Sequence, residues 1–502
     1  MASTFSGLTI AYTGLQTYQA ATNTTAHNIS NVKTDGYSRQ KLDITAADAL
    51  RVYSSYGCVG QGVQANSIER VRNEYYDEKY RNNASRLGEY EMKDNYMTQI
   101  EDYLNEFKLE GFTTEYDNFF KALEELQKNP SDDTLKNQVI SYGTSIAEYF
   151  NTLSKNLQGI QQNANQEIQN KVTEINTIAQ NIASLNKQIN IIEVHGTKAN
   201  DLRDERDKLL DDLSSIVNIE VSEKEIGNGA TTFDVKINGQ YIVDTYNYNT
   251  LELTAKEDRQ HASDADGMYD ITWSNGFTFN EYLTSLGGEL RALIDIRDGC
   301  NDGIETSAGN VEYYGQVTAN YKGIPHYQAQ LNRFVNTFVD AINSVFKKGE
   351  STNGDAGMDF FTVKYEGSDL SATNIQVNEE YVNHPSKFPT TYDASQGISN
   401  ADLVDEMIAL KDDKMFDGGT ASYFLQSLVS EVSIDAEKAR TFNTNFKNIS
   451  NTVKNQRLSV MGTDEDEEAM DLMKFQSAYN LCGQVMSVLN QMYNKLINEM
   501  GI

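Results

Sequence analysis

The sequence predicts a mainly α protein: a long helical bundle formed by the N- and C-terminal regions, an inserted β domain, and coiled-coil helices at both termini. Three observations support this fold class. Apolar residues recur at steps of three and four near both ends and through the middle of the chain. Only 4 of the 502 residues are Pro, which interrupts helices. From Ile219 the apolar period becomes two, which is typical of strands.

The N-terminal segment, residues 1–40, starts with 30 residues that include no Lys, Arg, Asp or Glu. Its helical seam consists of small and apolar residues: Leu8, Ala11, Leu15, Tyr18, Thr22, Thr25, Ile29 and Val32. A surface helix normally carries solvated charges on its outer side, so an uncharged helix indicates burial among many neighbours, as in a polymer core. The ordinary alternative is that the two terminal helices pair within one chain.

The stretch NVKTDGYSRQ, residues 31–40, separates this uncharged helix from a densely charged chain. Asp35-Gly36 predicts a turn, because Gly adopts positive φ at little cost. We therefore interpret the stretch as a joint between the terminal helix and an outer bundle. Tyr37 and Arg39 either contact a neighbouring subunit or belong to a connection within the chain.

The helical bundle is assigned to residues 41–216, 285–348 and 398–464. Apolar residues at helical spacing from Leu153 to Ile192 predict a rod of roughly 40 residues. The next helix is ANDLRDERDKLLDDLSSIV, with Asn200 as its expected N-cap. We expect the many charges of this helix to form a solvated face.

Residues 217–284 form the inserted β domain, in which TTFDVKINGQYIVD alternates apolar and polar residues around Asn238-Gly239, a favoured hairpin turn. Residues 349–397 are expected to be a short irregular and β-like segment.

The C-terminal segment, residues 465–502, continues a heptad seam to the end of the chain. Thr463 or Asp464 is expected to cap its helix, and the acidic residues that follow suit the positive end of the helix dipole. The seam comprises Leu472, Phe475, Tyr479, Cys482, Met486, Leu489, Tyr493, Leu496 and Met500. Together with Leu8, Leu15 and Ile29, these apolar positions apart from Cys482 and Met500 are the predicted assembly interface, and Asp35, Gly36, Tyr37 and Arg39 form the junction turn.

Composition argues against several functions. A net charge of −31 would repel nucleic acids and anionic membrane surfaces, and no apolar run approaches the roughly 18 residues of a membrane span. The five His residues are scattered, and no nucleophile elbow or phosphate-binding loop occurs. We predict no enzyme activity, no cofactor and no metal site. The acidic loops DADGMYD and NGDAGMD do not complete a calcium-binding pattern.

Several stretches, in this order, resemble the family of the first hook-associated protein of the bacterial flagellum, whose members join the hook to the filament. The first is NISNVKTDGYSRQ, which resembles the signature of flagellar axial proteins and whose GYSRQ ending is most similar to this family. The others are FFKALEELQKNPSDDTLKNQVI, ANDLRDERDKLL, GGELRALIDIRD, IPHYQAQLNRFVNTFVDAIN, SATNIQVN and FQSAYNLCGQVMSVLNQMYNKLIN. Each motif is weak alone, but their ordered combination is specific.

The resemblance implies an extracellular structural protein of the flagellum that self-assembles into a short axial ring through its terminal helices. It also implies flagellar type III export without a cleaved signal peptide, and a role in motility. The implied partners are other copies of the chain, the hook protein, the second hook–filament junction protein, and a cytoplasmic export chaperone at the C-terminal helix. A flagellin or hook-like axial subunit is the alternative, and a secreted calcium-binding or hydrolytic protein is a distant one.

Overall fold

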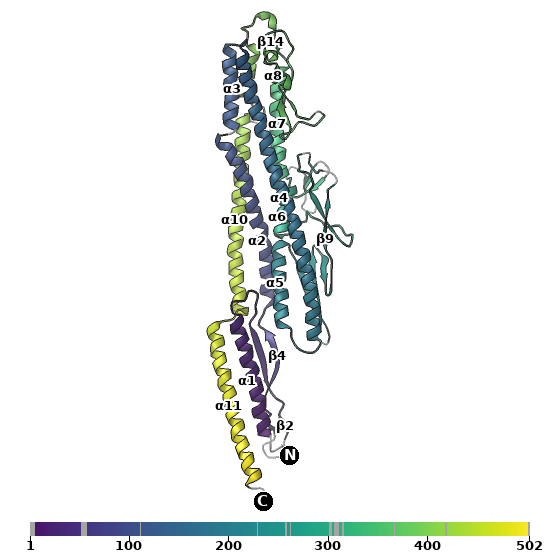
Figure 1. The fold of residues 1–502 in the computed structure, drawn as a ribbon, viewed down its shortest axis with the longest axis vertical. Coiled ribbons are helices and arrows are strands. Elements are labelled where there is room, and N and C mark those ends of the chain that lie inside the picture. Colours follow the sequence, from purple (N-terminus) through teal and green to yellow (C-terminus); the bar gives the residue numbers. More distant parts are fainter. Residues whose placement is uncertain are drawn as a thin grey trace. The chain divides into compact units, whose positions relative to one another are not determined.

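The computed structural model describes residues 6–51, 58–110, 112–227, 229–256, 259–261, 263–300, 304–305, 311–313, 316–365, 367–416 and 419–499. Long helices dominate (Figure 1). The helices are α1 (Ser6–Asn31), α2 (Glu74–Glu110), α3 (Phe112–Lys128), α4 (Asp133–Glu193), α5 (Asn200–Ile216), α6 (Gly288–Asp298), α7 (Ile324–Phe346), α8 (Glu379–Asn383), α9 (Asp402–Ala409), α10 (Ala421–Met461) and α11 (Glu465–Asn498), with short 3₁₀ turns at Pro385–Lys387 and Ala394–Gln396. The predicted fold class, mainly helical with long terminal helices and an inserted sheet region, is confirmed.

The strands are short. They are β1 (Gln40–Ala46), β2 (Leu50–Arg51), β3 (Cys58–Val59), β4 (Val63–Arg70), β5 (Glu220–Gly227), β6 (Ala230–Ile237), β7 (Gln240–Asp244), β8 (Asn247–Tyr248), β9 (Leu251–Ala255), β10 (Tyr269–Trp273), β11 (Ile304–Glu305), β12 (Val311–Tyr313), β13 (Gln316–Thr318), β14 (Glu350–Ser351), β15 (Phe361–Val363), β16 (Ile375–Val377) and β17 (Pro389–Thr391). All strand pairs among the described residues are antiparallel.

The chain forms two compact units. Unit 1 comprises Met1–Ser85, Ile175–Thr250 and Lys447–Ile502, and unit 2 comprises Arg86–Glu174 and Leu251–Phe446. The helices α2, α4 and α10 are divided between the two units. The terminal segments therefore share a unit with parts of the predicted bundle, which the sequence had assigned to a separate domain.

Unit 1 contains an antiparallel hairpin that the sequence did not predict. Strands β1 and β4 pair from Gln40↔Arg70 to Ala46↔Val63, with one irregularity after Asp43, and this hairpin packs against α1. The prediction that the helical bundle begins at residue 41 is wrong for β1 and β4, which are strands. Leu42 and Ile44 do alternate with polar residues, but two short strands give a weak signal beside the long helical seams.

The predicted β domain over 217–284 is not one sheet. Strands β5–β6–β7–β8 form an antiparallel meander in unit 1, whereas β9 and β10 pair in unit 2. The turn at Asn238-Gly239 is confirmed, because both residues have positive φ, 49° and 78°, and join paired strands. The two sheets contact different parts of α4. The meander contacts Asn186 of α4, in unit 1, and strand β10 contacts Asn165 of α4, in unit 2.

Unit 2 has a core rich in aromatic rings. Phe334 stacks on Phe416 with ring centroids 5.1 Å apart, and Phe346 lies 4.7 Å from Phe360. The predicted α4 seam is buried here from Leu153 to Val172. Residues 349–397 form β14 to β17, α8 and two 3₁₀ turns, as expected for a short irregular and β-like segment.

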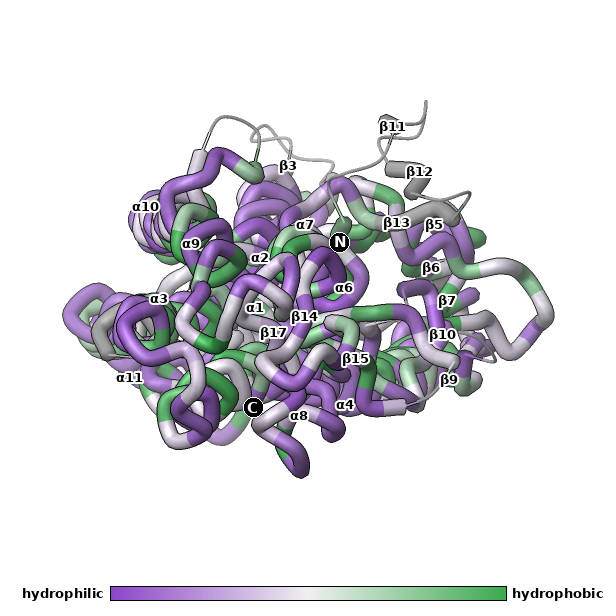
Figure 2. The backbone as a smooth tube through the Cα atoms, turned by 90° about the horizontal axis from the view of Figure 1, so that it is seen from above, coloured by the Kyte–Doolittle hydropathy of each residue, from purple (hydrophilic) through white to green (hydrophobic). Residues whose placement is uncertain are grey.

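Hydrophilic and hydrophobic residues are interspersed along the backbone (Figure 2). None of the described helices combines the length and apolar character needed to cross a membrane. Among the described residues, no three His, Cys, Asp or Glu side chains gather as a metal site would require. Asp264 of the loop DADGMYD instead accepts hydrogen bonds from the backbone N–H of His261 and from Gln161.

Candidate assembly interface and its joint

The two terminal helices pair with each other in one chain. Figure 1 shows α1 and α11 side by side, and small residues of α1 mark their closest contacts. A Cβ atom at Gly7 would lie 3.2 Å from the side chain of Leu489, and one at Gly14 would lie 2.8 Å from Sγ of Cys482. About four turns further along, Asn28 donates a hydrogen bond of 2.9 Å to Glu468.

These contacts share one antiparallel register. Each step of seven residues forward along α1, from Gly7 to Gly14, matches seven residues back along α11, from Leu489 to Cys482. Ala21, which is 1% exposed, occupies the next such position on α1. Small residues at heptad spacing let two helix backbones approach closely, with larger side chains of α11 filling the space.

The predicted seam of α1 coincides only in part with the contact: Ala11 and Thr25 are buried and Tyr18 stacks on Phe475, but its Leu and Ile residues are not the most buried positions. The residues Leu8, Leu15 and Ile29 are half-buried beside the contact line, whereas Gly14, Thr17, Ala21, Thr24 and Asn28 are buried. Apolarity alone pointed to the Leu and Ile positions, but a close helix pair selects for small size at the point of contact.

The seam predicted on α11 faces α1 for most of its length. Phe475 stacks on Tyr18 at 6.5 Å between ring centroids, and Leu489 contacts Gly7. Leu472, Phe475, Met486, Leu489 and Tyr493 are half-buried, whereas Tyr479 and Leu496 are exposed. Asp464 caps the helix by accepting from the N–H groups of Asp466 and Glu467.

A second apolar stripe on α11 is exposed. It consists of Met473, Leu481, Val485, Val488, Met492 and Leu496, spaced by three or four residues apart from the gap at Ser477. Val488 is 55% exposed and Met492 60% exposed. Between Lys474 and Lys495 the helix contains no charged residue at all. The helix thus has one apolar face for α1 and another without a partner among the described residues.

The joint at residues 31–40 is fixed by hydrogen bonds within the chain. Gly36 has a φ of 83°, the positive value expected for the turn. A Cβ atom at Gly36 would lie 3.3 Å from the side chain of Lys208. Asp35 lies 3.6 Å from the same lysine. The Tyr37 hydroxyl donates to Asn28 at 2.7 Å, and burial together with the nearby acidic residue Asp201 raises the pKa of Tyr37.

Asn28 ties the end of α1 to the first strand. Its amide nitrogen donates to the carbonyl of Gln40 at 2.8 Å, and its amide oxygen accepts from the N–H of Gln40 at 3.0 Å. The same amide nitrogen also reaches Glu468. The side chain therefore imitates a strand partner for Gln40 while contacting both terminal helices.

Arg39 connects the joint to the start of α11. Its Nε lies 2.6 Å from Glu468, which is only 2% exposed, and its NH1 and NH2 groups lie 3.2 Å from Glu467 and 3.7 Å from Asp471. Its backbone N–H donates to the carbonyl of Met461 at the end of α10. Arg39 and Tyr37 thus both have partners within the chain, which supports the intramolecular interpretation of these two side chains.

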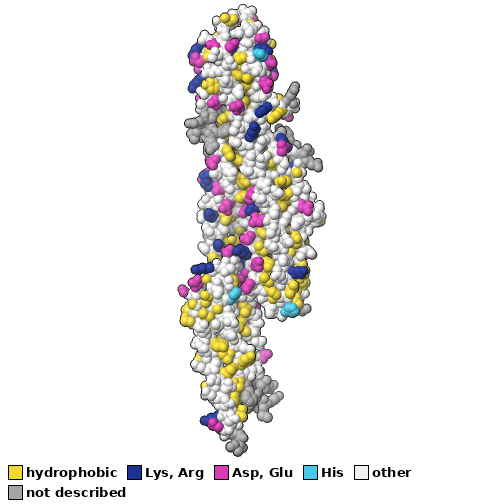
Figure 3. Space-filling model, viewed as in Figure 1, with side chains coloured by type: hydrophobic (Ala, Val, Ile, Leu, Met, Phe, Trp, Pro, Cys, Tyr) yellow, Lys and Arg dark blue, Asp and Glu magenta, His cyan; other side chains and the backbone are white. Residues whose placement is uncertain are grey.

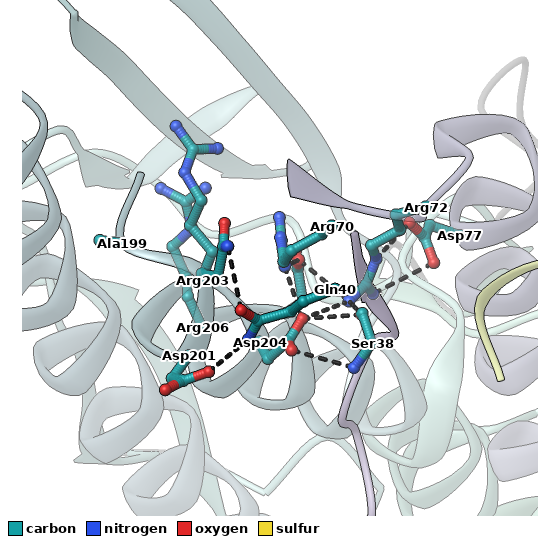
Figure 4. A network of polar contacts seen from close by, with 12 residues as sticks. Ser38, Gln40, Arg70, Arg72, Asp77, Ala199, Asp201, Arg203, Asp204 and Arg206 are labelled. Atoms are coloured by element: carbon teal, nitrogen blue, oxygen red, sulfur yellow. Dashed lines mark hydrogen bonds and ion pairs between the residues drawn. The ribbon is translucent and has the colours of Figure 1, made fainter. Parts of the chain in front are cut away.

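The joint rests on a buried ionic cluster (Figure 4). Ser38 donates to Asp204 of α5 through both its N–H and its hydroxyl, at 2.9 and 2.7 Å. Arg70, at the end of β4, lies 2.7 Å from Asp204 and 2.8 Å from Asp207. Arg72 reaches Asp207 at 3.1 Å. The hairpin, the β4–α2 connection and α5 therefore meet through paired charges.

The cluster continues toward α10. Arg81 lies 3.2 Å from Asp207 and 3.0 Å from Asp211, and Arg457 lies 2.6 Å from Asp211 and 2.7 Å from Asp77. Four arginines and four aspartates from β4, α2, α5, α10 and the β4–α2 connection alternate in this cluster.

The sequence prediction for α5 was wrong in two respects. Only part of its charge forms the expected solvated face: Asp201, Glu205, Lys208 and Asp212 are exposed, whereas Asp204, Arg206 and Asp207 are buried. Asn200 is not the N-cap; it donates instead to the carbonyl of Ile68 and to Gln40. The matching arginines lie more than 100 residues away in the sequence, except for Arg206, so helix-local analysis could not find them.

Gly14 gives a direct test of the helix pair. Gly14→Leu should destabilise unit 1 by about 1–3 kcal/mol, because the new side chain must displace Cys482. The matched control is Gly483→Leu on α11, where a Cβ meets no atom within 4 Å and where replacing Gly should stabilise the helix by about 0.8 kcal/mol. Urea unfolding followed by circular dichroism measures both; equal effects would exclude the close contact.

Comparisons with known proteins agree with this architecture. A model of the flagellar hook-associated protein FlgK helical domain matches residues 97–361, more than half of the chain. Flagellar hook-associated protein 1 of Bacillus subtilis is 29% identical over 527 residues, covering 100% of this chain and 99% of that protein. The corresponding protein of Escherichia coli is 23% identical over 583 residues, covering 97% and 98%.

A solved structure shares the fold. The flagellar hook junction protein FlgK from Burkholderia pseudomallei superposes with a TM-score of 0.59 at 13% sequence identity, over 76% of this chain and 100% of that one. The family that the sequence motifs suggested is thereby confirmed. The chain belongs to the FlgK family of flagellar hook-associated proteins.

Proposed function

We propose that this protein is a structural subunit of the flagellar axis that joins the hook to the filament by self-assembly through its terminal helices. Family membership supports a structural role in the flagellum rather than an enzymatic one. The observation that carries the assembly mechanism is the exposed apolar stripe of α11, because a soluble chain gains little by leaving six large apolar side chains in water.

The surface over the terminal pair supports this proposal. Figure 3 shows hydrophobic side chains over α1 and α11 with few charged side chains between them. Both helices are uncharged over long stretches, so contact with further helices would bury no unpaired charge. In an axial ring, the exposed stripe of one copy would pack against the terminal helices of the next copy.

The partners proposed for this surface are those that the sequence resemblance implies. The hook protein would contact the ring on one side and the second hook–filament junction protein on the other. Before assembly, a cytoplasmic export chaperone would cover the exposed stripe of α11, and the chain would leave the cell by flagellar type III export without a cleaved signal peptide. The ten seam residues predicted as the assembly interface then divide: Leu496 belongs to the exposed stripe, whereas Phe475, Leu489 and Tyr493 contact α1.

The test places charge on the exposed stripe. The double variant Val485→Asp/Val488→Asp should have a free energy of unfolding within about 0.5 kcal/mol of the wild-type value, because both side chains are exposed in the single chain. In a strain that lacks its own copy of the gene, the variant should fail to support filament growth and motility, because each buried unpaired carboxylate costs several kcal/mol in the assembled ring.

Two further variants make the test specific. Asn448→Asp places one negative charge on an exposed position of α10, outside the terminal pair, and should support normal motility. Leu489→Asp places it on the face toward α1 and should lower the melting temperature of the isolated protein. Normal filaments from the Val485→Asp/Val488→Asp protein would refute the assembly role of the exposed stripe.

A further inference from the structure

Unit 2 contains a polar cavity of about 490 Å³ that the assembly function does not use. Its walls come from α2, the loop before α6, α6 itself, the segment before α7, and α10. The lining residues are Arg86, Glu89, Tyr90, Lys93, Thr284, Arg291, Asp295, Asn320, Tyr321, Lys322, Asp435, Lys438 and Ala439. Five of these are cationic and three are anionic, although the whole chain carries a net charge of −31.

The inner wall of the cavity is held by paired charges. Lys93 is buried and lies 2.7 Å from both Glu89 and Asp295, and Arg291 lies 2.7 Å from Asp295. Burial lowers the pKa of Lys93, but Asp295 and Glu89 outweigh it and raise that pKa, so the ammonium group stays charged. These ion pairs hold the inner wall of the cavity together.

Two cations near the opening have donors to spare. Arg86 is exposed and reaches only Glu89, at 3.3 Å from one nitrogen. Lys438 is exposed and forms no ion pair with any residue that the structure describes. Lys322 differs from them, because Glu431 and Asp435 lie 2.5 and 3.3 Å from its ammonium group.

Two phenol groups add neutral donors. Tyr90 and Tyr321 both line the cavity, and the ring of Tyr321 lies 4.5 Å from the ammonium group of Lys93. Neither hydroxyl forms a hydrogen bond with another part of the described chain. Burial raises the pKa of Tyr321, so its hydroxyl keeps its proton and can donate it in a hydrogen bond.

We propose that this cavity binds a small oxyanion, namely a phosphate or sulfate group or a small molecule that carries one. A guanidinium, an ammonium and two hydroxyl groups are all hydrogen-bond donors, and charged donors to oxyanions make short, strong hydrogen bonds. The volume exceeds that of a single phosphate and lies in the usual range for small-molecule sites. The inference goes beyond the proposed function, because it concerns unit 2 of the single chain and not assembly.

Isothermal titration calorimetry of the full-length protein with inorganic phosphate, at constant ionic strength, tests the site. We expect saturable binding of one phosphate per chain. Arg86→Gln/Lys438→Gln should weaken this binding at least tenfold. Tyr321→Phe should weaken phosphate binding several-fold. This variant keeps the charge of the protein and the aromatic ring next to the ammonium group of Lys93. Lys447→Gln, on α10 but outside the cavity lining, is the matched control and should bind as wild type.

A site in the cavity requires that phosphate binding depend on the lining residues and not on net charge. Absence of saturable phosphate binding, or equal binding by wild type and Arg86→Gln/Lys438→Gln, would overturn the proposal. Equal weakening by Lys447→Gln would also overturn it, because the effect would then follow net charge. The alternative occupant is an acidic side chain of a second copy of the chain. If phosphate bound to neither the wild type nor Arg86→Gln/Lys438→Gln, and this variant lost self-association, the alternative would hold and the oxyanion site would be refuted. Motility of the Val485→Asp/Val488→Asp strain does not enter this result, so the two proposals fail independently.

Discussion

Asp207→Ala is expected to lower the free energy of unfolding of unit 1 by about 3–5 kcal/mol, the usual cost of removing one partner of a buried ion pair. Asp207 is buried and lies within 3.2 Å of the guanidinium groups of Arg70, Arg72 and Arg81. Without its carboxylate, these three cations face one another with too few anions between them. The joint is held by the same cluster, so its hydrogen bonds should loosen as well.

Chemical unfolding followed by two probes can assign this loss to unit 1. The only Trp, Trp273, lies on β10 in unit 2, so its fluorescence reports unit 2, whereas circular dichroism reports helices of both units. The variant should shift the dichroism transition more than the fluorescence transition. Glu205→Ala, at an exposed position of the same helix, is the control and should change stability by less than about 0.5 kcal/mol. A similar small effect for Asp207→Ala would contradict the cluster.

The same carboxylate predicts a pH dependence. Burial alone would raise the pKa of Asp207, but Arg72, Arg70 and Arg81 outweigh it and hold that pKa below its ordinary value. A lowered pKa in the folded state stabilises the fold above the unfolded pKa of about 3.9, and this contribution is lost as the pH falls through the folded pKa. The stability difference between wild type and Asp207→Asn should therefore narrow below about pH 4.

Arg297→Ala is expected to destabilise unit 2 by a similar amount, about 3–5 kcal/mol. Arg297 is fully buried, and its NH2 group lies 2.5 Å from Asp298 and 3.1 Å from Glu281. Its NH1 group donates to the carbonyl of Tyr269 at 2.7 Å and to Asn165 at 3.0 Å. One side chain thus joins α6, β10 and α4, and its removal leaves two buried carboxylates short of a cation.

The fluorescence of Trp273 measures this loss, because Tyr269 and Trp273 share strand β10. Burial raises the pKa of Asp298, but Arg297 and Lys256 outweigh it and lower that pKa to about 2, so the carboxylate is charged at neutral pH and depends on them. Arg259→Ala is the control: Arg259 is about half exposed and pairs with Asp266 at 2.6 Å, and such surface pairs contribute about 0–1 kcal/mol. If both variants unfolded alike, Arg297 would not organise unit 2.

The sequence by itself determined the helical fold class, the long α4 seam, the hairpin turn at Asn238-Gly239, and the family. These features depend on local periodicity, on backbone preferences of single residues, or on the order of motifs along the chain. The turn at Gly36 belongs to the same group, because positive φ is a property of the residue itself.

Only the tertiary structure decided which faces of the terminal helices meet and which charges are buried. The contact of α1 with α11 runs through Gly7 and Gly14, because close approach of two backbones favours small side chains, a property that an apolar pattern does not rank. Asp204 and Asp207 of α5 look solvated within their own helix. They are buried because arginines from β4, α2 and α10 meet them in space, and pairing between residues so far apart in sequence leaves no periodic trace in either segment.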